Sequence, residues 1–169
     1  MNDEALRKQN TFGRDFLTWL AYKSDDRAGK LELASGETFS IWVDRKIVLE
    51  DDRPAPPNIV SYAGDDFTNL EIKAAVRSGK KVREARLRIE QGQNTWTFTL
   101  RGDRMEVAGL KIDMPRAADS DEQFFGRIVS IESLNKLLDG LYTDFLMDVH
   151  GSQWKAKGYR HFQKWLKTA

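Results

Sequence analysis

The stretch from Ala85 to Arg101, ARLRIEQGQNTWTFTLR, decides the fold class of this chain. Its apolar residues occupy alternate positions: Ala85, Leu87 and Ile89 before the segment Gln91–Asn94, and Trp96, Phe98 and Leu100 after it. A period of two is typical of strands with one buried face, so the stretch predicts an antiparallel hairpin. Its apolar rows can share one face against a helix layer. The opposite face is then polar and positive, with Arg86, Arg88, Thr97, Thr99 and Arg101.

Further β-forming segments flank this hairpin. Lys30–Leu33 and Thr38–Val43 surround the turn residues Ser35, Gly36 and Glu37 and predict a second hairpin. Three more segments are expected to be short strands: 46–49, 59–62 and 104–112.

Two amphipathic helices are expected in the first half of the chain. Apolar residues recur at helical spacing from about Phe12 to Tyr22, with Thr11 placed as N-cap. A second helix, from Leu70 through Val76, is expected to be capped by Asp65 or Asp66 and to stop at Gly79.

The second half predicts a long helix and a basic one. Apolar spacing is sustained from Asp121 to Phe145, with Ser120 and the acidic first turn favouring a start there. Gly126 and Gly140 are expected to kink or divide this helix. After Gly151, Ser152 is placed as the cap of a last helix that mixes aromatic and basic residues.

These elements predict an α+β fold: antiparallel hairpins packed against amphipathic helices, with a long helix and a basic helix at the C-terminus. A length of 169 residues favours a single domain, 1–169. Three of the four prolines lie in Glu50–Pro57, which cannot continue a sheet, and we place a subdomain boundary there, near 50–57.

Composition and motifs exclude several classes of functional site. Cysteine is absent, which excludes disulfides, thiolate metal sites and a cysteine nucleophile, and no run of 18 apolar residues indicates a membrane span. We expect a cytoplasmic protein. Neither a P-loop nor a G-x-G-x-x-G motif occurs, and His150 and His161 lack metal-ligand spacing. No cofactor and no small-molecule substrate are therefore indicated.

Two acidic clusters are the remaining hint of catalysis. Residues 50–52 and 119–122 could in principle bind Mg²⁺ for nuclease chemistry, which needs convergent carboxylates. A solvated loop and a helix N-terminus explain them better, so we expect no enzyme activity.

Charge is strongly segregated although the net charge is only +1. Residues 71–111 carry 10 basic and 5 acidic residues, and residues 149–169 carry 5 basic and none acidic. The densest strip runs from Lys73 to Arg88, and phosphate contacts need several such cations on one surface. Its predicted nucleic-acid-binding residues are Lys73, Arg77, Lys80, Lys81, Arg86 and Arg88. An ordinary solvated face is the alternative.

The basic C-terminal helix has its own alternatives. Trp154, Tyr159, Phe162 and Trp165 recur at helical spacing among its cations, which usually indicates core packing. Stacking on bases and binding at a membrane surface are the weaker interpretations.

Three segments of the chain together resemble a known family. Phe16-Leu17-Thr18-Trp19-Leu20, the segment from Ala74 to Val82 leading into the hairpin, and the late helix 134–146 resemble the C-terminal half of the recombination-associated protein RdgC family. The resemblance spans roughly residues 12 to 147 and includes no catalytic signature. It implies a dimeric α+β protein that forms a positively lined ring, binds duplex DNA with little sequence preference and restrains recombinase-driven strand exchange. This chain lacks the family's N-terminal half, so the resemblance does not extend to the closure of that ring.

We therefore expect a non-enzymatic, largely sequence-independent DNA-binding protein that modulates recombination in the nucleoid, with duplex DNA and a second copy as partners. The alternative is a protein-interaction module that docks through its segregated positive and negative surfaces. The preference for single or double strands and the oligomeric state stay open.

Overall fold

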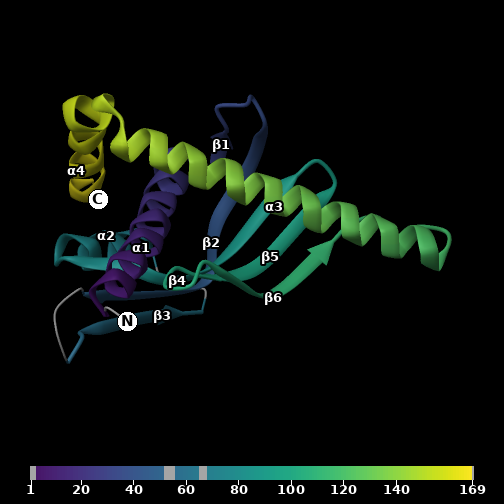
Figure 1. The fold of residues 1–169 in the computed structure, drawn as a ribbon, viewed down its shortest axis with the longest axis horizontal. Coiled ribbons are helices and arrows are strands. Elements are labelled where there is room, and N and C mark those ends of the chain that lie inside the picture. Colours follow the sequence, from purple (N-terminus) through teal and green to yellow (C-terminus); the bar gives the residue numbers. More distant parts are fainter. Residues whose placement is uncertain (1–2, 52–55, 65–67, 169) are drawn as a thin grey trace.

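The computed structural model describes residues 3–51, 56–64 and 68–168, and side chains from Phe12 onward. In this part of the chain one six-stranded antiparallel sheet packs against helices (Figure 1). The elements are α1 (Asp3–Asp26), β1 (Lys30–Glu32), β2 (Thr38–Asp51), β3 (Ile59–Ala63), α2 (Asn69–Arg77), β4 (Lys80–Gln91), β5 (Asn94–Arg101), β6 (Glu106–Asp113), α3 (Ser120–His150), the π-helical turn η1 (Trp154–Gly158) and α4 (Tyr159–Lys167). The predicted α+β class is confirmed.

The sheet is centred on the predicted hairpin. Its strand order is β1-β2-β4-β5-β6, and β3 pairs with the second half of β2. The hairpin of β4 and β5 is confirmed, with Arg88 opposite Thr97 and Gln91 opposite Asn94.

Strand β2 corrects one expectation. The segments predicted as two strands, 38–43 and 46–49, belong to one strand that runs from Thr38 to Asp51. Arg45 has a φ of 60°, and the pairing with β4 shifts register between Val43 and Ile47. Such a bulge bends a strand and increases its twist without ending it.

The core lies between one face of the sheet and the helices. Buried sheet residues include Ile41, Leu49, Leu87, Ile89, Trp96 and Phe98, and the helices contribute Phe16, Leu17, Leu20, Leu134, Leu137, Leu141 and Phe145. The rings of Phe16 and Phe145 meet edge to face at 5.5 Å where α1 and α3 pack together. The period of two in β4 and β5 therefore sends one row of side chains into this core and the other row outward.

Helix α1 begins earlier than predicted. It starts at Asp3, so Thr11 lies inside the helix and is not its N-cap. The segment before Phe12 contains good helix formers and no Gly or Pro, which lets the helix extend. Further along, Gly13 lies against the β5–β6 turn: a Cβ there would sit 1.8 Å from the Gly102 carbonyl oxygen.

Helix α2 begins after a different cap from the one expected. Its N-cap is Thr68, whose backbone N–H donates to the Glu71 carboxylate, as in a capping box. Asp65 and Asp66, the residues predicted as caps, lie outside the described residues. Most of the proline-rich segment 50–57 also lies outside the described residues. The strands on either side of it, β2 and β3, pair in one sheet.

Helix α3 is the longest element and runs unbroken through both of its glycines. Asp119 caps it by accepting a hydrogen bond from the Asp121 backbone at 2.7 Å. Gly126 and Gly140 neither kink nor divide it. Both allow close packing instead: a Cβ would lie 2.8 Å from Met114 at Gly126 and 2.7 Å from Leu33 at Gly140. Figure 1 shows the first turns of α3 projecting beyond β6 and its other end leading to α4.

The last helix is preceded by a π-helical turn. Gly158 ends that turn against the Trp154 indole, with 2.5 Å from its would-be Cβ to Cε3. Across the described residues, none of the helices combines the length and the apolar character needed to cross a bilayer.

Candidate nucleic-acid interface

Lys73, the first of the predicted phosphate contacts, is buried in the structure. Its side chain is 8% exposed, and its Nζ lies 3.1 Å from the Asp25 carboxylate. The same ammonium donates to Thr168 Oγ1 at 3.1 Å and stands 5.3 Å from the centre of the Trp165 ring. Lys73 therefore joins α2 to α1 and α4, and its charge is already compensated.

The next three cations lie near the start of β4. Arg77 is exposed at the end of α2. Lys80 is 8% exposed and donates to Ser78 Oγ at 3.1 Å. Lys81 pairs with Asp15 of α1 at 2.8 Å. Of the three, Arg77 is the cation that projects furthest into solvent.

Arg86 and Arg88 lie on the outer face of the sheet, as predicted, but that face is not positive overall. Arg86 lies 3.3 Å from the Asp44 carboxylate, and Arg88 pairs with Glu90. Neighbouring pairs continue the pattern, since Glu84 lies within 4 Å of both Lys46 and Arg101. Cations and carboxylates alternate across this face, so its field is largely cancelled.

The structure thus distributes the six predicted residues over different surroundings. Lys73 faces the helix layer, Lys80 and Lys81 lie near the α2–β4 junction, and Arg86 and Arg88 point to the opposite side of the sheet. A strip that is continuous in sequence is therefore not one surface in space, because the strand alternates its faces.

The strongest uncompensated positive feature is on α4 and the π-helical turn η1 before it. We call Lys157 of η1 and Arg160, Lys164 and Lys167 of α4 the α4 stripe; all four are exposed. Spacings of four and three residues place the three α4 cations along one side of that helix. Residues 149–169 contain no acid, and within the described part of the chain no ion pair to the stripe occurs. The sequence signal was present, but the aromatic residues between these cations favoured a purely structural interpretation.

The other side of α4 packs on the domain. Tyr22 meets Phe162 edge to face at 5.3 Å and Trp165 at 5.2 Å, which confirms the packing role predicted for these two residues. Tyr159, predicted with them, is instead 50% exposed. Burial, followed by the charges of Asp26 and Asp148, raises the pKa of Tyr22 to about 12. The Trp165 indole N–H donates to Asp25 at 2.6 Å. The stripe is therefore held on a rigid support.

The C-terminal end of α4 lies against α2, the helix that carries the exposed Arg77. The Lys73–Thr168 hydrogen bond joins the two helices. Arg77 follows Lys73 by one turn on α2. Of the predicted set, Arg77 is therefore the exposed cation on the helix next to α4.

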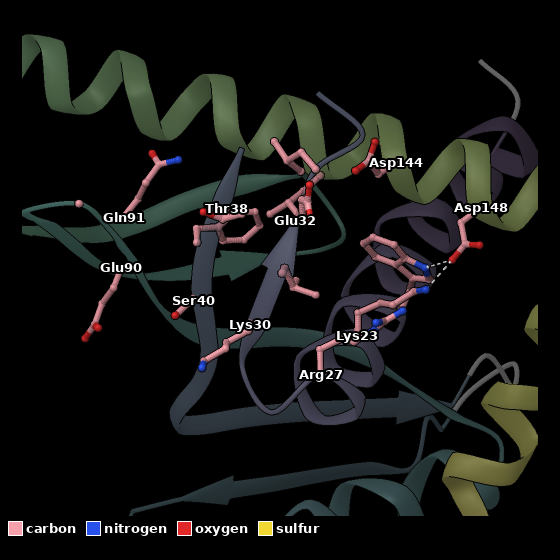
Figure 2. Close-up of a pocket in the computed structure, with 16 residues that line it drawn as sticks. Lys23, Arg27, Lys30, Glu32, Thr38, Ser40, Glu90, Gln91, Asp144 and Asp148 are labelled. Carbon is pink, nitrogen blue, oxygen red and sulfur yellow. Dashed lines mark hydrogen bonds and ion pairs between the residues drawn. The ribbon is translucent and has the colours of Figure 1, made fainter. Parts of the chain in front are cut away.

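A groove of about 790 Å³ lies on another part of the molecule, between α1, β1, β2 and α3 (Figure 2). Two of its carboxylates, Asp144 and Asp148, are engaged in structural contacts. Asp148 accepts from the Trp19 indole at 2.9 Å and lies 3.1 Å from Lys23 Nζ, while Asp144 accepts from the Ala34 backbone at 3.0 Å. These contacts fix α3 to α1 and β1.

Three members of the acidic clusters considered for metal binding are also engaged. Glu50 lies 3.3 Å from Arg14 and 3.0 Å from Arg83, and Asp51 accepts from the Asn58 backbone at 3.0 Å. In the second cluster Asp119 caps α3. Among the described residues no group of three or more His, Cys, Asp or Glu side chains is arranged to hold a metal ion.

Comparison with models of known families and with curated proteins finds no match for this chain. The similarity to the RdgC family therefore stays a hypothesis based on the residues quoted above. The assignment of function rests on the geometry of the site.

Proposed function

We propose that this protein binds duplex DNA with little sequence preference, through phosphate contacts from the α4 stripe and Arg77. The single observation that carries the proposal is the α4 stripe itself: exposed cations, no interleaved acid, and a rigid support. The proposal assigns the protein no catalytic step. It also includes a cytoplasmic location and a role in recombination.

Compensation of charge is the reason for preferring α4 to the sheet face. A cation without a carboxylate partner gains fully from contact with a phosphate and releases the counterions condensed on DNA. Arg86 and Arg88 would first have to leave Asp44 and Glu90, which lowers their net gain. Phosphate contacts also fix orientation without reading sequence, so low specificity follows.

Binding itself is tested by fluorescence anisotropy of two labelled duplexes of unrelated sequence, titrated with the full chain at low and moderate salt. Five phosphate contacts, from the four stripe residues and Arg77, predict a loss of affinity of about 500-fold when salt rises fourfold. Equal affinities for both duplexes are expected. No binding at micromolar protein in low salt would refute the proposal.

The surface is tested by paired charge reversals. Arg160→Glu with Lys164→Glu should weaken binding at least tenfold for both duplexes. The control, Lys111→Glu with Arg116→Glu, makes the same change in net charge at exposed residues outside the stripe and should have a much smaller effect. Equal losses in the two variants would show that net charge rather than the α4 stripe is responsible.

A further inference from the structure

The first turns of α3 expose an unusual amount of apolar surface. Phe124 is 60% exposed, Phe125 64% and Val129 60%. Ile128 and Ile131 beside them are 38% and 39% exposed. We call these five residues the α3 patch. Scattered exposed apolar residues are normal, but a contiguous patch that includes two phenylalanines indicates an interaction surface.

Helix α3 is attached to the domain through the side opposite the middle of this patch. Ser130 accepts a hydrogen bond from the Trp96 indole at 2.9 Å, and the other buried residues of α3 follow Ser130 on the same side. At 3.6 residues per turn, Phe125 and Ile128 lie on the opposite side of the helix. Figure 1 shows these turns projecting past the sheet, so Phe125 and Ile128 face outward.

Acidic residues continue the line of Phe125 and Ile128 along α3. Asp121 lies one turn before Phe125, and Glu132 lies one turn after Ile128. Spacings of four, three and four residues keep these four side chains in one row, which we call the α3 row. Asp139 lies two turns further along the same side. All three carboxylates are exposed, and none has an ion-pair partner within the described part of the chain.

Bases do not compensate the α3 row. This part of α3 contains two of them, Arg127 and Lys136. Arg127 precedes Ser130 by three residues and therefore lies toward the attached side. Lys136 lies beside the row together with Glu122, which is close to four whole turns away on the same margin. The row therefore keeps its negative charge.

We propose that the α3 patch and the α3 row bind a basic amphipathic helix of another protein, laid along α3. The charge of the row selects this occupant. Carboxylates attract basic residues and disfavour nucleic acid and anionic lipid, which carry charge of the same sign. The spacing selects it as well, because the side chains of a second helix also recur every three and four residues and can pack along such a row.

The α3 row predicts the sequence pattern of its partner. Asp121 and Glu132 are three turns apart, about 16 Å along the helix axis, with Phe125 and Ile128 between them. The partner helix needs a basic residue near each carboxylate and apolar residues between the two bases, at the same spacings of four, three and four. This pattern is identical in both directions, so a parallel and an antiparallel partner satisfy it equally. A contact of three turns is smaller than a standard interface, so binding is weak and reversible.

Fluorescence anisotropy of a labelled peptide titrated with the full chain tests the proposal. The matched peptide is an alanine-rich helix with lysine at its first and twelfth positions and leucine at its fifth and eighth. A control peptide of the same composition has both lysines moved two positions inward, which turns them to the other side of the helix. The matched peptide should bind at high micromolar protein, about fivefold more tightly than the control. No binding of the matched peptide, or equal binding of both, would overturn the proposal.

A matched pair of variants places the binding on α3. Phe125→Gln removes the ring at the centre of the patch without adding charge, and it should weaken binding of the matched peptide about tenfold. Met147→Gln is the control, since Met147 is 63% exposed on the same helix but lies outside the patch. The control should leave the affinity unchanged. Equal losses in the two variants would contradict the assignment.

Charge reversal tests the acidic residues of the α3 row. The wild type should prefer the matched peptide over a version with glutamate in place of both lysines, and Glu132→Lys should remove this preference. Glu122→Lys makes the same change in net charge at an exposed residue beside the row, and it should leave the preference intact. A preference that survives in Glu132→Lys, or that both variants lose equally, would refute the role of the row.

Other occupants of the α3 patch give different results. Co-sedimentation with phosphatidylcholine vesicles that is lost in Phe125→Gln would indicate a lipid surface. A mass that rises with concentration from 19.4 kDa toward twice that value, and does not rise in Phe125→Gln, would indicate a second copy of the chain. Either result without binding of the matched peptide would overturn the proposal.

The proposal does not depend on DNA binding through the α4 stripe. Phe125→Gln changes no residue of the stripe, so its affinity for duplex DNA should equal that of the wild type. A protein that binds the matched peptide but no duplex would refute the proposed function alone, and the converse would refute this inference alone.

Discussion

Asp25 fixes α4 to the rest of the domain, and its removal should destabilise the protein strongly. Its carboxylate accepts from the Trp165 indole at 2.6 Å and lies 3.1 Å from the Lys73 ammonium. It also accepts from the Asn69 side-chain amide. Asp25→Ala therefore leaves a cation that is only 8% exposed without its counter-charge, and an indole N–H without its acceptor.

The size of the effect follows from these contacts. Removing one partner of a buried ion pair costs about 3–5 kcal/mol, because the other charge stays desolvated. The Asp25 side chain is 22% exposed, so we take a value at the lower end, about 3 kcal/mol in the free energy of unfolding. For a domain of this size that corresponds to a decrease in Tm of roughly 6–12 °C.

Urea unfolding followed by tryptophan fluorescence and by circular dichroism measures this change. Asp26→Ala is the matched control, since Asp26 is the adjacent acid, its side chain is 43% exposed, and its nearest cation, Arg27, is 3.8 Å away. The control should lose less than about 0.5 kcal/mol. Adding Lys73→Met to Asp25→Ala should recover part of the loss by removing the uncompensated charge. Equal stabilities of the Asp25 and Asp26 variants would refute this reasoning.

Three further perturbations test the packing of the fold. Gly13→Ala places a methyl group against the Gly102 carbonyl, so thermal unfolding should show a loss of at least about 2 kcal/mol. Ser130→Ala removes the acceptor of the buried Trp96 indole N–H and should cost about 1–3 kcal/mol in urea unfolding. The pKa of Tyr22 is raised from 10.0 to about 12, so its contribution to stability is complete below pH 10 and is lost as pH rises from 10 to 12. This contribution amounts to about 2–3 kcal/mol. The free energy of unfolding of Tyr22→Phe should therefore fall less over that pH range than that of the wild type. Tyrosinate absorbance of the wild type should show one tyrosine that titrates later than the others.

The strands could be predicted because their signal is local. Alternation in β4 and β5 depends on consecutive residues, and the buried face follows from it directly. The bulge at Arg45 could not be predicted, since no Gly or Asn marks that left-handed position. The start of α1 was missed because a polar helical turn has no apolar periodicity to reveal it.

The site was predicted less completely because it depends on contacts distant in sequence. Glu90 is two residues from Arg88 on the same strand face, so that pairing could be anticipated. Asp44 reaches Arg86 from another strand, and Asp25 reaches Lys73 from another helix. Only the fold brings these carboxylates to the cations. The ion pair with Asp25 removes Lys73 from the proposed interface.

Periodicity was also ambiguous for α3. Phe124 and Phe125 lie in the stretch of apolar spacing that predicted α3, but that pattern does not show which of its members are buried. The structure leaves both exposed, because α3 is longer than the sheet beneath it. The length of a helix relative to its partner layer is a tertiary property that a local pattern does not contain.

The salt dependence of DNA binding tests the central claim most directly. The slope of log affinity against log salt should be about −4.5 for the wild type and should become shallower by about 2 in the Arg160→Glu, Lys164→Glu variant. The Arg86→Glu, Arg88→Glu variant should change the slope much less, because those cations are already paired. If the sheet variant flattens the slope and the α4 variant does not, the phosphate-binding surface is on the sheet and our assignment is wrong.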